Sequence, residues 1–453
     1  MRTASVATRG TPAHSSPRRA PAHAARDGRA LGPAASLGLL ASILVSLLAA
    51  SSAPTPLYAI YQAHWGFSPI TITVVFGVYA VAVLASLLIF GKFSDHVGRR
   101  PVLLVSLIGQ AVAMIVFATA GGVGSLLVAR VIQGISTGAA VGALGAGMLD
   151  INPRKGGFLN SLAPTLGTAS GALVSGLIVQ YLPGPTRLVY FVLLGVFVLQ
   201  AFAVLGLRET ASRKPGALAS LVPEIKMPKS ARASVVTAAP VLFAVWALTG
   251  LYGALGPAIT RTLVHSSSVV WGGLPLFVLA GSAGLSVLVL RTKATRRVML
   301  IGVSTLVVGV VITVVSIAAG NGGTASVVGF FVGAAVSGFG FGGGFQGGIR
   351  LVMPQVELHE RAGMLSLLYV VCYLGLGLPA VIGGVLVVHG GLVLTAREYG
   401  AAVIVLALAA LPGLLRSGRR AEPTARTVVP AGVPSEDTAQ AEDHRLVSVV
   451  EVE

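Results

Sequence analysis

The sequence predicts an all-α polytopic membrane protein with twelve transmembrane helices arranged as two pseudo-symmetric six-helix bundles. Three observations support this fold class. The 453 residues are 54% hydrophobic with a mean hydropathy of +0.86, which is too apolar for a soluble chain of this length. Apolar segments that reach the roughly 20 residues needed to cross the hydrocarbon fill most of 36–416. The two halves of this region also repeat the same features in the same order.

The apolar segments divide the chain into five parts. The first bundle is predicted over 36–208, with helices near 36–62, 70–91, 101–119, 122–149, 157–182 and 188–208. A polar, proline-containing segment over 209–234 predicts a cytoplasmic linker. The second bundle is predicted over 235–416, with helices near 235–263, 269–290, 298–318, 324–352, 361–389 and 397–416. The polar segments 1–35 and 417–453 predict disordered cytoplasmic tails.

Positive charges recur in alternate loops. They are Arg99, Arg100, Arg154, Lys155, Arg213, Lys214, Lys226, Lys229, Arg232, Arg291, Lys293, Arg296 and Arg297. The loops near 63–69, 119–124, 264–270 and 319–325 contain no Lys or Arg. Cytoplasmic loops carry an excess of Lys and Arg, so both termini are expected in the cytoplasm. This topology accounts for most of the net charge of +17, and the expected partner is a lipid bilayer rather than nucleic acid.

Three features recur after roughly 200 residues, which indicates an internal repeat of six helices. The pairs are 98–106 with 295–304, Pro56 with Pro257, and the loop 150–156 with the loop 357–363. Pro54 and Pro56 should also interrupt the hydrogen bonding of the first helix and bend it. The preference for Arg over Lys and for Ala, Gly and Val indicates a GC-rich bacterial gene.

The loop over 91–100 reads GKFSDHVGRR and concentrates charge between two apolar segments. Gly91 permits close helix approach, and Gly98 allows the chain to reverse. Asp95 can accept hydrogen bonds from Arg or from a helix N-terminus. Arg99 and Arg100 are placed to anchor the next helix at an anionic membrane surface.

This loop resembles the signature loop of the major facilitator superfamily, G-x-L-[AS]-D-[RK]-x-G-R-[RK]. Phe93 replaces the usual leucine, and His96 replaces a usual arginine or lysine. The resemblance covers 36–416 and implies a transporter whose loop stabilises the outward-open state. With His96 in place of a permanent cation, we expect this latch to weaken as pH rises. The resemblance also implies cytoplasmic gate pairs among Asp95, Asp150, Arg154, Glu357 and Arg361.

The sequence Arg130-Val-Ile-Gln133-Gly134 resembles a second motif of the family, R-x-x-q-G. An arginine in hydrocarbon is costly, so it is either functional or buried against a partner; snorkelling to the interface is the alternative. In relatives this arginine is linked to proton coupling or to the substrate cavity. Candidate coupling or cavity residues are the polar or aromatic side chains near mid-depth. They are Tyr58, Tyr61, Gln62, Arg130, Gln133, Tyr252, Gln346, Arg350, Tyr369 and Tyr373.

A glycine-rich segment, 167–176, resembles the antiporter motif G-x-x-x-G-P-x-x-G-G through Gly167, Gly171 and Gly176. Ala172 stands where the motif has proline, and Ser175 where it has glycine. Small residues at this spacing also serve general helix packing. The match favours export over import.

The predicted function is secondary active transport, by a monomer in the bacterial plasma membrane, of a small drug-like or amphiphilic compound. Proton antiport is the expected energy source, although the first helix has no Asp or Glu. A proton-independent facilitator and a metabolite importer are therefore alternatives.

An enzyme is a remote alternative. Ser136 lies in a G-x-S-x-G pattern, but no strand-to-helix elbow surrounds it. No cofactor and no metal are expected, because His64, His265 and His389 lack a ligand-like pattern.

Overall fold

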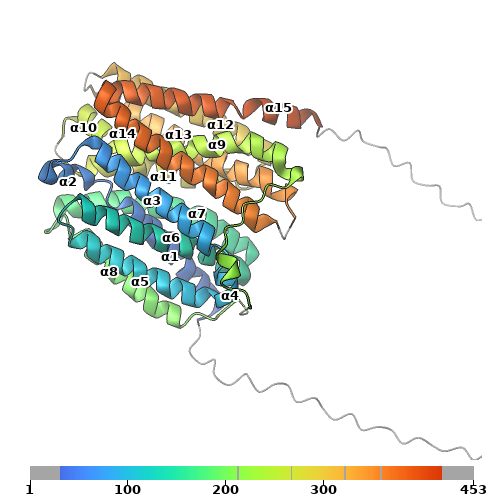
Figure 1. Ribbon diagram of the computed structural model, residues 1–453. Helices are drawn as coiled ribbons and strands as arrows, with labels where there is room; N and C mark the ends of the chain where they lie inside the picture. The colour runs from blue at the N-terminus through green and yellow to red at the C-terminus, as the bar shows by residue number, and fades with distance from the viewer. Residues whose placement is uncertain (1–30, 212–213, 267, 321–322, 358–359, 421–453) are drawn as a thin grey trace, which may run out of the picture.

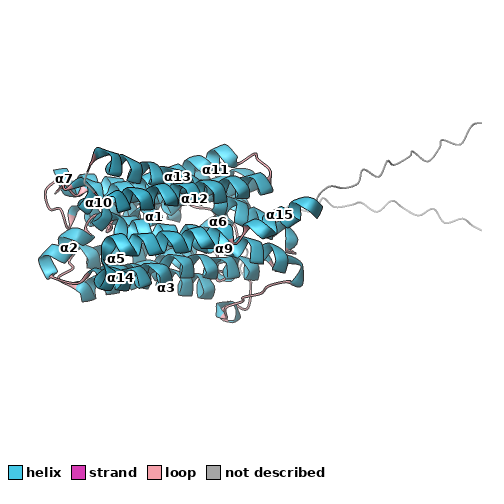
Figure 2. Cartoon of the chain, turned by 90° about the horizontal axis from the view of Figure 1, so that it is seen from above, coloured by secondary structure: helices cyan, strands magenta, loops and turns pink. Residues whose placement is uncertain are grey.

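The computed structural model of the protein describes residues 31–211, 214–266, 268–320, 323–357 and 360–420. Within these ranges the chain forms helices joined by short loops, without strands (Figure 2). Most of the two predicted tails lies outside the described residues. The parts that are described correct the prediction, because 33–35 already belong to the first helix and 417–420 to the last.

The first half contains six membrane crossings, and the first crossing is interrupted. Its helices are α1 Pro33–Ser52, α2 Tyr58–Trp65, α3 Pro69–Phe90, α4 Ser94–Val97, α5 Arg99–Ala118, α6 Val123–Ile151, α7 Pro153–Tyr181 and α8 Leu188–Leu205. The prediction of one helix over 36–62 was wrong in its continuity. Pro54 and Pro56 lie in the turn between α1 and α2, where proline lacks the N–H that a continuous helix needs.

The second half repeats this arrangement after a linker. The linker contains η1 Ala219–Leu221 and η2 Lys229–Ala231. The helices that follow are α9 Arg232–Gly250, η3 Leu251–Leu255, α10 Gly256–Val264, α11 Val270–Leu290, α12 Thr295–Ala319, α13 Thr324–Val352, η4 Met353–Gln355, α14 Arg361–Leu408 and α15 Leu411–Arg420. The seventh crossing, predicted as one helix over 235–263, contains the π-helical turn η3 between α9 and α10.

The last two crossings form a hairpin within α14. Gly391 has φ 79° and ψ 167°, a conformation outside the helical region that glycine adopts readily. The apolar segment Gly363–Leu415 has 53 residues, which in a straight helix would extend about 80 Å across a hydrocarbon core of about 30 Å. A Cβ on Gly383 would lie 3.3 Å from the Tyr399 ring, so the two arms pack side by side. The eleven candidate spans of the described chain thus supply twelve crossings.

The two halves form separate bundles that lie next to each other (Figure 1). Each bundle has its own apolar core. Two helix pairs join the bundles, α3 with α14 and α7 with α11. Small residues allow this close packing, since a Cβ on Gly77 would lie 2.8 Å from Val381 Cγ2.

Charge divides the molecule into two ends. Arg99, Arg154, Arg291 and Arg296 lie where the chain enters or leaves the bundles at one end, which we call the basic end. At the opposite end, Arg187, Arg261 and Arg397 are cations among the described residues. Positive charge therefore favours the basic end without being confined to it, although the four uncharged loops of the sequence indicate a complete separation.

Replacing Gly273 in α11 with leucine should destabilise the inter-bundle contact, because a side chain there would overlap the backbone of Ala172 in α7. Overpacking of this kind costs about 1–3 kcal/mol. The measurement is the free energy of unfolding from titration with dodecyl sulfate. Gly281→Leu is the control, because a Cβ at this position of the same helix meets nothing within 4 Å. Equal losses in both variants would contradict the packing assignment.

Candidate transport site and gate

The break between α1 and α2 leaves backbone carbonyls without helical partners. Ala50 loses its donor because Pro54 has no N–H, and the N–H of Thr55 donates to Ser52 instead of Ser51. Two side chains of α6 replace these donors. Gln133 Nε2 donates to Ala50 O at 3.0 Å, and Arg130 Nη1 donates to Ser51 O at 3.0 Å. Ser175 Oγ of α7 similarly donates to Ala53 O at 2.6 Å.

Arg130 is fully buried, which excludes snorkelling. Its Nε and Nη2 donate to Tyr58 Oη at 3.1 and 2.5 Å, and its Nη1 also donates to Gln133 Oε1 at 2.6 Å. The guanidinium carbon lies 5.1 Å from the ring centroid of Tyr79 and 5.5 Å from that of Phe117. No carboxylate of the described residues pairs with this cation. Neutral acceptors and aromatic faces therefore stabilise the buried charge.

An aromatic cluster joins this network to the second bundle. Phe76 and Tyr79 of α3 pack with Trp246 of α9 and Tyr373 of α14, and Tyr369 packs against the group. We call these five residues the interface cluster. The Trp246 and Tyr373 ring centroids lie 4.9 Å apart. Because the Tyr79 ring also faces Arg130, the buried cation and the inter-bundle contact share one side chain.

Polar atoms of two side chains, on α9 and α13, are buried without a hydrogen-bond partner. They are Trp246 Nε1, a donor, and Gln346 Oε1, an acceptor. Trp246 belongs to the interface cluster and lies beside Phe345 of α13, with ring centroids 6.0 Å apart. Gln346 is the next residue of α13. Unpartnered buried polar groups are costly, and a ligand can relieve that cost. Trp246 was missed by the sequence analysis; its only signal is an indole in the middle of an apolar segment.

The other predicted cavity residues lie elsewhere. Tyr61 Oη donates to Tyr190 Oη at 3.1 Å in the first core, and Gln62 Nε2 donates to Phe67 O. Tyr252 lies in η3, with its Oη 2.7 Å from Thr313 Oγ1 in the second core. Arg350 Nη2 donates to the carbonyl of Arg291 at the basic end. The structure therefore brings Tyr58, Gln133 and Arg130 together but places Tyr252 and Arg350 outside that group.

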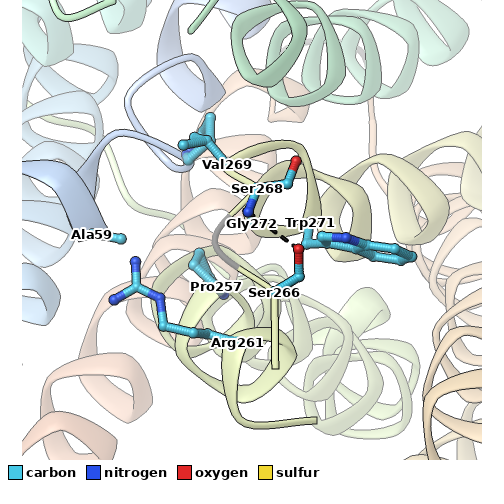
Figure 3. Close-up of a pocket in the computed structure, with 9 residues that line it drawn as sticks. Ala59, Pro257, Arg261, Ser266, Ser268, Val269, Trp271 and Gly272 are labelled. Carbon is cyan, nitrogen blue, oxygen red and sulfur yellow. Dashed lines mark hydrogen bonds between the residues drawn. The ribbon is translucent and has the colours of Figure 1, made fainter. Parts of the chain in front are cut away.

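The bundles also meet at the end opposite the basic end. A cavity of about 30 Å³ lies between α2, α10 and α11 (Figure 3). A Cβ on Gly272 would lie 3.5 Å from both Pro56 and Pro257, the two prolines of the internal repeat. The bundles are therefore closely packed at this end.

The signature loop is ordered by Arg99. Its Nη1 donates to Ser94 Oγ at 2.6 Å and pairs with Asp95, and its Nε lies 3.4 Å from Asp150 Oδ2. Gly98 has φ 113°, which favours glycine and reverses the chain before α5. Gly91 packs against Gly142 of α6. A Cβ on Gly142 would lie 3.1 Å from the Gly91 carbonyl oxygen. The loop thus forms a charge network within the first bundle.

The linker binds this loop, which the sequence analysis missed. The Glu209 carboxylate accepts hydrogen bonds from the Arg99 and Arg100 amides at 2.8 and 3.1 Å, at the N-terminus of α5. Such a cap satisfies free amides and complements the helix dipole. His96 Nδ1 lies 3.1 Å from Pro215 O, a bond that a neutral imidazole can donate.

A second linker carboxylate reaches toward the other bundle. Glu224 pairs with Lys92 of the loop and with Lys226. Burial, and then repulsion from Lys226, lower the pKa of Lys92 below its usual value, while Asp95 acts in the opposite direction. A Cβ on Gly363, at the start of α14, would lie 3.1 Å from Lys226 Cβ. The linker therefore contacts both bundles at the basic end.

The predicted gate residues of the other loops lie at the basic end of both bundles. Asp150 belongs to the Arg99 network and also accepts from Thr210 Oγ1 at 3.0 Å. Arg154 is exposed in the first turn of α7. Glu357 follows η4, and Arg361 Nε lies 3.5 Å from Val356 O in the same segment.

The glycines of the antiporter-like segment serve two contacts. Gly167 and Gly171 face the α1 backbone at Val45 and Ala49 within the first bundle. Gly176 faces Val270 of α11, because a Cβ on Gly176 would lie 3.3 Å from Val270 Cα. Small residues here allow both close approaches.

Twelve crossings in two joined bundles, with a buried cation next to their interface, define a polytopic helical membrane protein. The chain belongs to the Major Facilitator Superfamily, whose family model matches residues 39–318, more than half of the chain.

Solved structures and curated relatives agree with this membership. A crystal structure of a mutant of the nucleoside transporter NupG aligns with a TM-score of 0.65 over 84% of this chain and 100% of that chain, at 14% identity. The class E tetracycline resistance protein of Escherichia coli is 37% identical over 82 residues, 18% of this chain and 20% of that protein. The class H tetracycline resistance protein of Pasteurella multocida is 33% identical over 110 residues, which are 23% of this chain and 27% of that protein. The chain matches only about a fifth to a quarter of these relatives' length.

Arg130→Lys should destabilise the first bundle, because one ammonium cannot replace the donors to both Ser51 and Tyr58. Leaving such buried acceptors unpaired costs about 1–3 kcal/mol. The free energy of unfolding of the purified protein measures the effect. Arg187→Lys, at an exposed arginine, is the matched control and should have little effect. A fully stable Arg130→Lys variant would show that the hydrogen bonds contribute nothing.

Glu209→Ala should free the Arg99 and Arg100 amides and raise their hydrogen–deuterium exchange. Loss of a cap of this kind costs about 1 kcal/mol, equivalent to a several-fold rise in exchange. Glu209→Gln keeps an acceptor oxygen and should give a smaller rise. Unchanged exchange in both variants would argue against the linker cap.

Proposed function

We propose that the protein exports a small, drug-like or amphiphilic organic compound across the bacterial plasma membrane by alternating access, driven by proton antiport. The observation that carries this proposal is the connection from buried Arg130 through Tyr79 to the interface cluster. The partial similarity to tetracycline resistance proteins supports export of a drug-like compound. The protein acts as a monomer, and its basic end, with both termini, faces the cytoplasm.

The substrate binds where the bundles meet. The aromatic rings of Tyr79, Trp246 and Tyr373 offer flat apolar contact. Trp246 Nε1 donates one hydrogen bond to the substrate, which satisfies this buried donor. A compound that carries a planar apolar part with a hydrogen-bond acceptor fits this arrangement. Movement of α3 against α14 changes the interface cluster and, through the Tyr79 ring, the surroundings of Arg130.

Proton coupling takes place at the signature loop. Asp95 and Asp150 both pair with Arg99. Protonation of either carboxylate therefore removes one of the two ionised partners of Arg99. The loosened loop then weakens the linker contacts that run through Lys92 and Glu224 to α14. A gate at this end opens when those contacts are lost.

A metabolite importer or a proton-independent facilitator is the second candidate. The observation in its favour is the absence of Asp and Glu from α1 and α2, which leaves the first crossing without a carboxylate. The likeness to a nucleoside transporter concerns the fold and adds nucleosides to the compounds worth testing.

Transport in proteoliposomes with an imposed pH gradient tests the proposal, with a panel that includes tetracycline and nucleosides. Accumulation should follow the proton gradient and disappear when it is collapsed. Trp246→Phe keeps the ring but loses Nε1–H, and should lower transport about two- to tenfold, as expected for one hydrogen bond.

Trp271→Phe is the matched control, because Trp271 lies at the opposite end against Phe331, with centroids 6.0 Å apart. Transport at an unchanged rate after collapse of the proton gradient would exclude proton antiport and favour the proton-independent facilitator. An equal effect of both tryptophan variants would remove Trp246 from the substrate site.

A further inference from the structure

A groove lies on the second bundle, away from the interface cluster, between α9 and the two arms of α14. It has a volume of about 280 Å³, and its walls include Phe243, Leu378, Pro379 and Ile382. Leu378 and Ile382 are 54% and 49% exposed. Apolar side chains exposed at this depth on membrane-spanning helices face lipid, so the groove opens to the bilayer.

The floor of the groove is fixed by Tyr399. Its Oη donates to the carbonyl of Ala247 at 2.7 Å, on the last turns of α9 before the π-helical segment. Its ring also lies against Gly383 of the opposite arm. The groove is therefore a preformed feature of the α14 hairpin.

One carboxylate, Glu398, lines this apolar groove. Glu398 lies seven residues after the Gly391 turn, a rise of about 10 Å along the helix, and is exposed at the rim of the groove. A carboxylate in a membrane-spanning segment is costly and indicates a functional site. No Lys or Arg pairs with it in the described part of the chain, and Arg397, the preceding residue, does not line the groove.

We propose that this groove binds a single-chain cationic amphiphile, an alkylammonium, with its ammonium at Glu398 and its chain between Leu378 and Ile382. The unpaired carboxylate supplies charge complementarity, and the apolar walls supply the contact for the chain. The volume lies near the lower end of small-molecule sites, about 300 Å³. It is too small for a helix of a second copy, whose diameter with side chains is about 10–12 Å.

Binding of dodecyltrimethylammonium to the full chain in phosphatidylcholine nanodiscs tests this site. Glu398→Gln should raise the dissociation constant about two- to fivefold, as expected for a charge pair with an exposed carboxylate. Ala402→Trp, which places a large side chain in the groove at an exposed position, should abolish binding without affecting the fold. Arg397→Gln is the matched control and should leave the dissociation constant unchanged.

Two outcomes would overturn the proposal. Equal binding of dodecyl sulfate, together with no effect of Glu398→Gln, would show apolar partitioning only. Weakening by Trp246→Phe but not by Glu398→Gln would place the amphiphile in the transport site instead. The binding measurement does not require transport, so its outcome tests the groove independently of the proposed export function.

Discussion

The hydrogen bonds from Arg130 and Gln133 to the end of α1 are the interactions on which the first bundle depends. Pro54 and Pro56 interrupt the first crossing and leave carbonyls in a region where water is scarce. The α6 side chains satisfy those carbonyls, and in doing so they fix where α1 and α6 meet. The same guanidinium lies over the Tyr79 ring, so the packing between the bundles depends on it as well.

The basic end follows a different physical principle. Its order comes from charges and capped amides, with Arg99 between two carboxylates and Glu209 at the start of α5. The opposite end is held by close packing of Pro56 and Pro257 against Gly272. Charge pairs respond to protonation and salt, whereas packed small residues do not. The two ends of one transporter are therefore sensitive to different conditions.

Much of the fold was predictable because hydropathy and charge bias act locally along the chain. The number of crossings, the linker and the proline break all follow from short stretches of sequence. Glu209 was not predictable as a cap, because its partners Arg99 and Arg100 lie more than a hundred residues away. Trp246 was missed for a similar reason: an unpartnered Nε1 is a property of the surrounding helices. Tyr252 has suitable chemistry, yet its helix turns it to a partner in the second core, and Arg350 lies at the basic end.

The interrupted first crossing has a consequence for how the opposite end can open. Because Arg130, Gln133 and Ser175 already satisfy the carbonyls at the break, few further backbone bonds must be lost when α2 changes its direction. This helix has only eight residues and begins directly after the prolines. A change in the direction of α2 would therefore be opposed by side-chain bonds more than by the backbone, because Arg130 holds Tyr58 at the start of this helix.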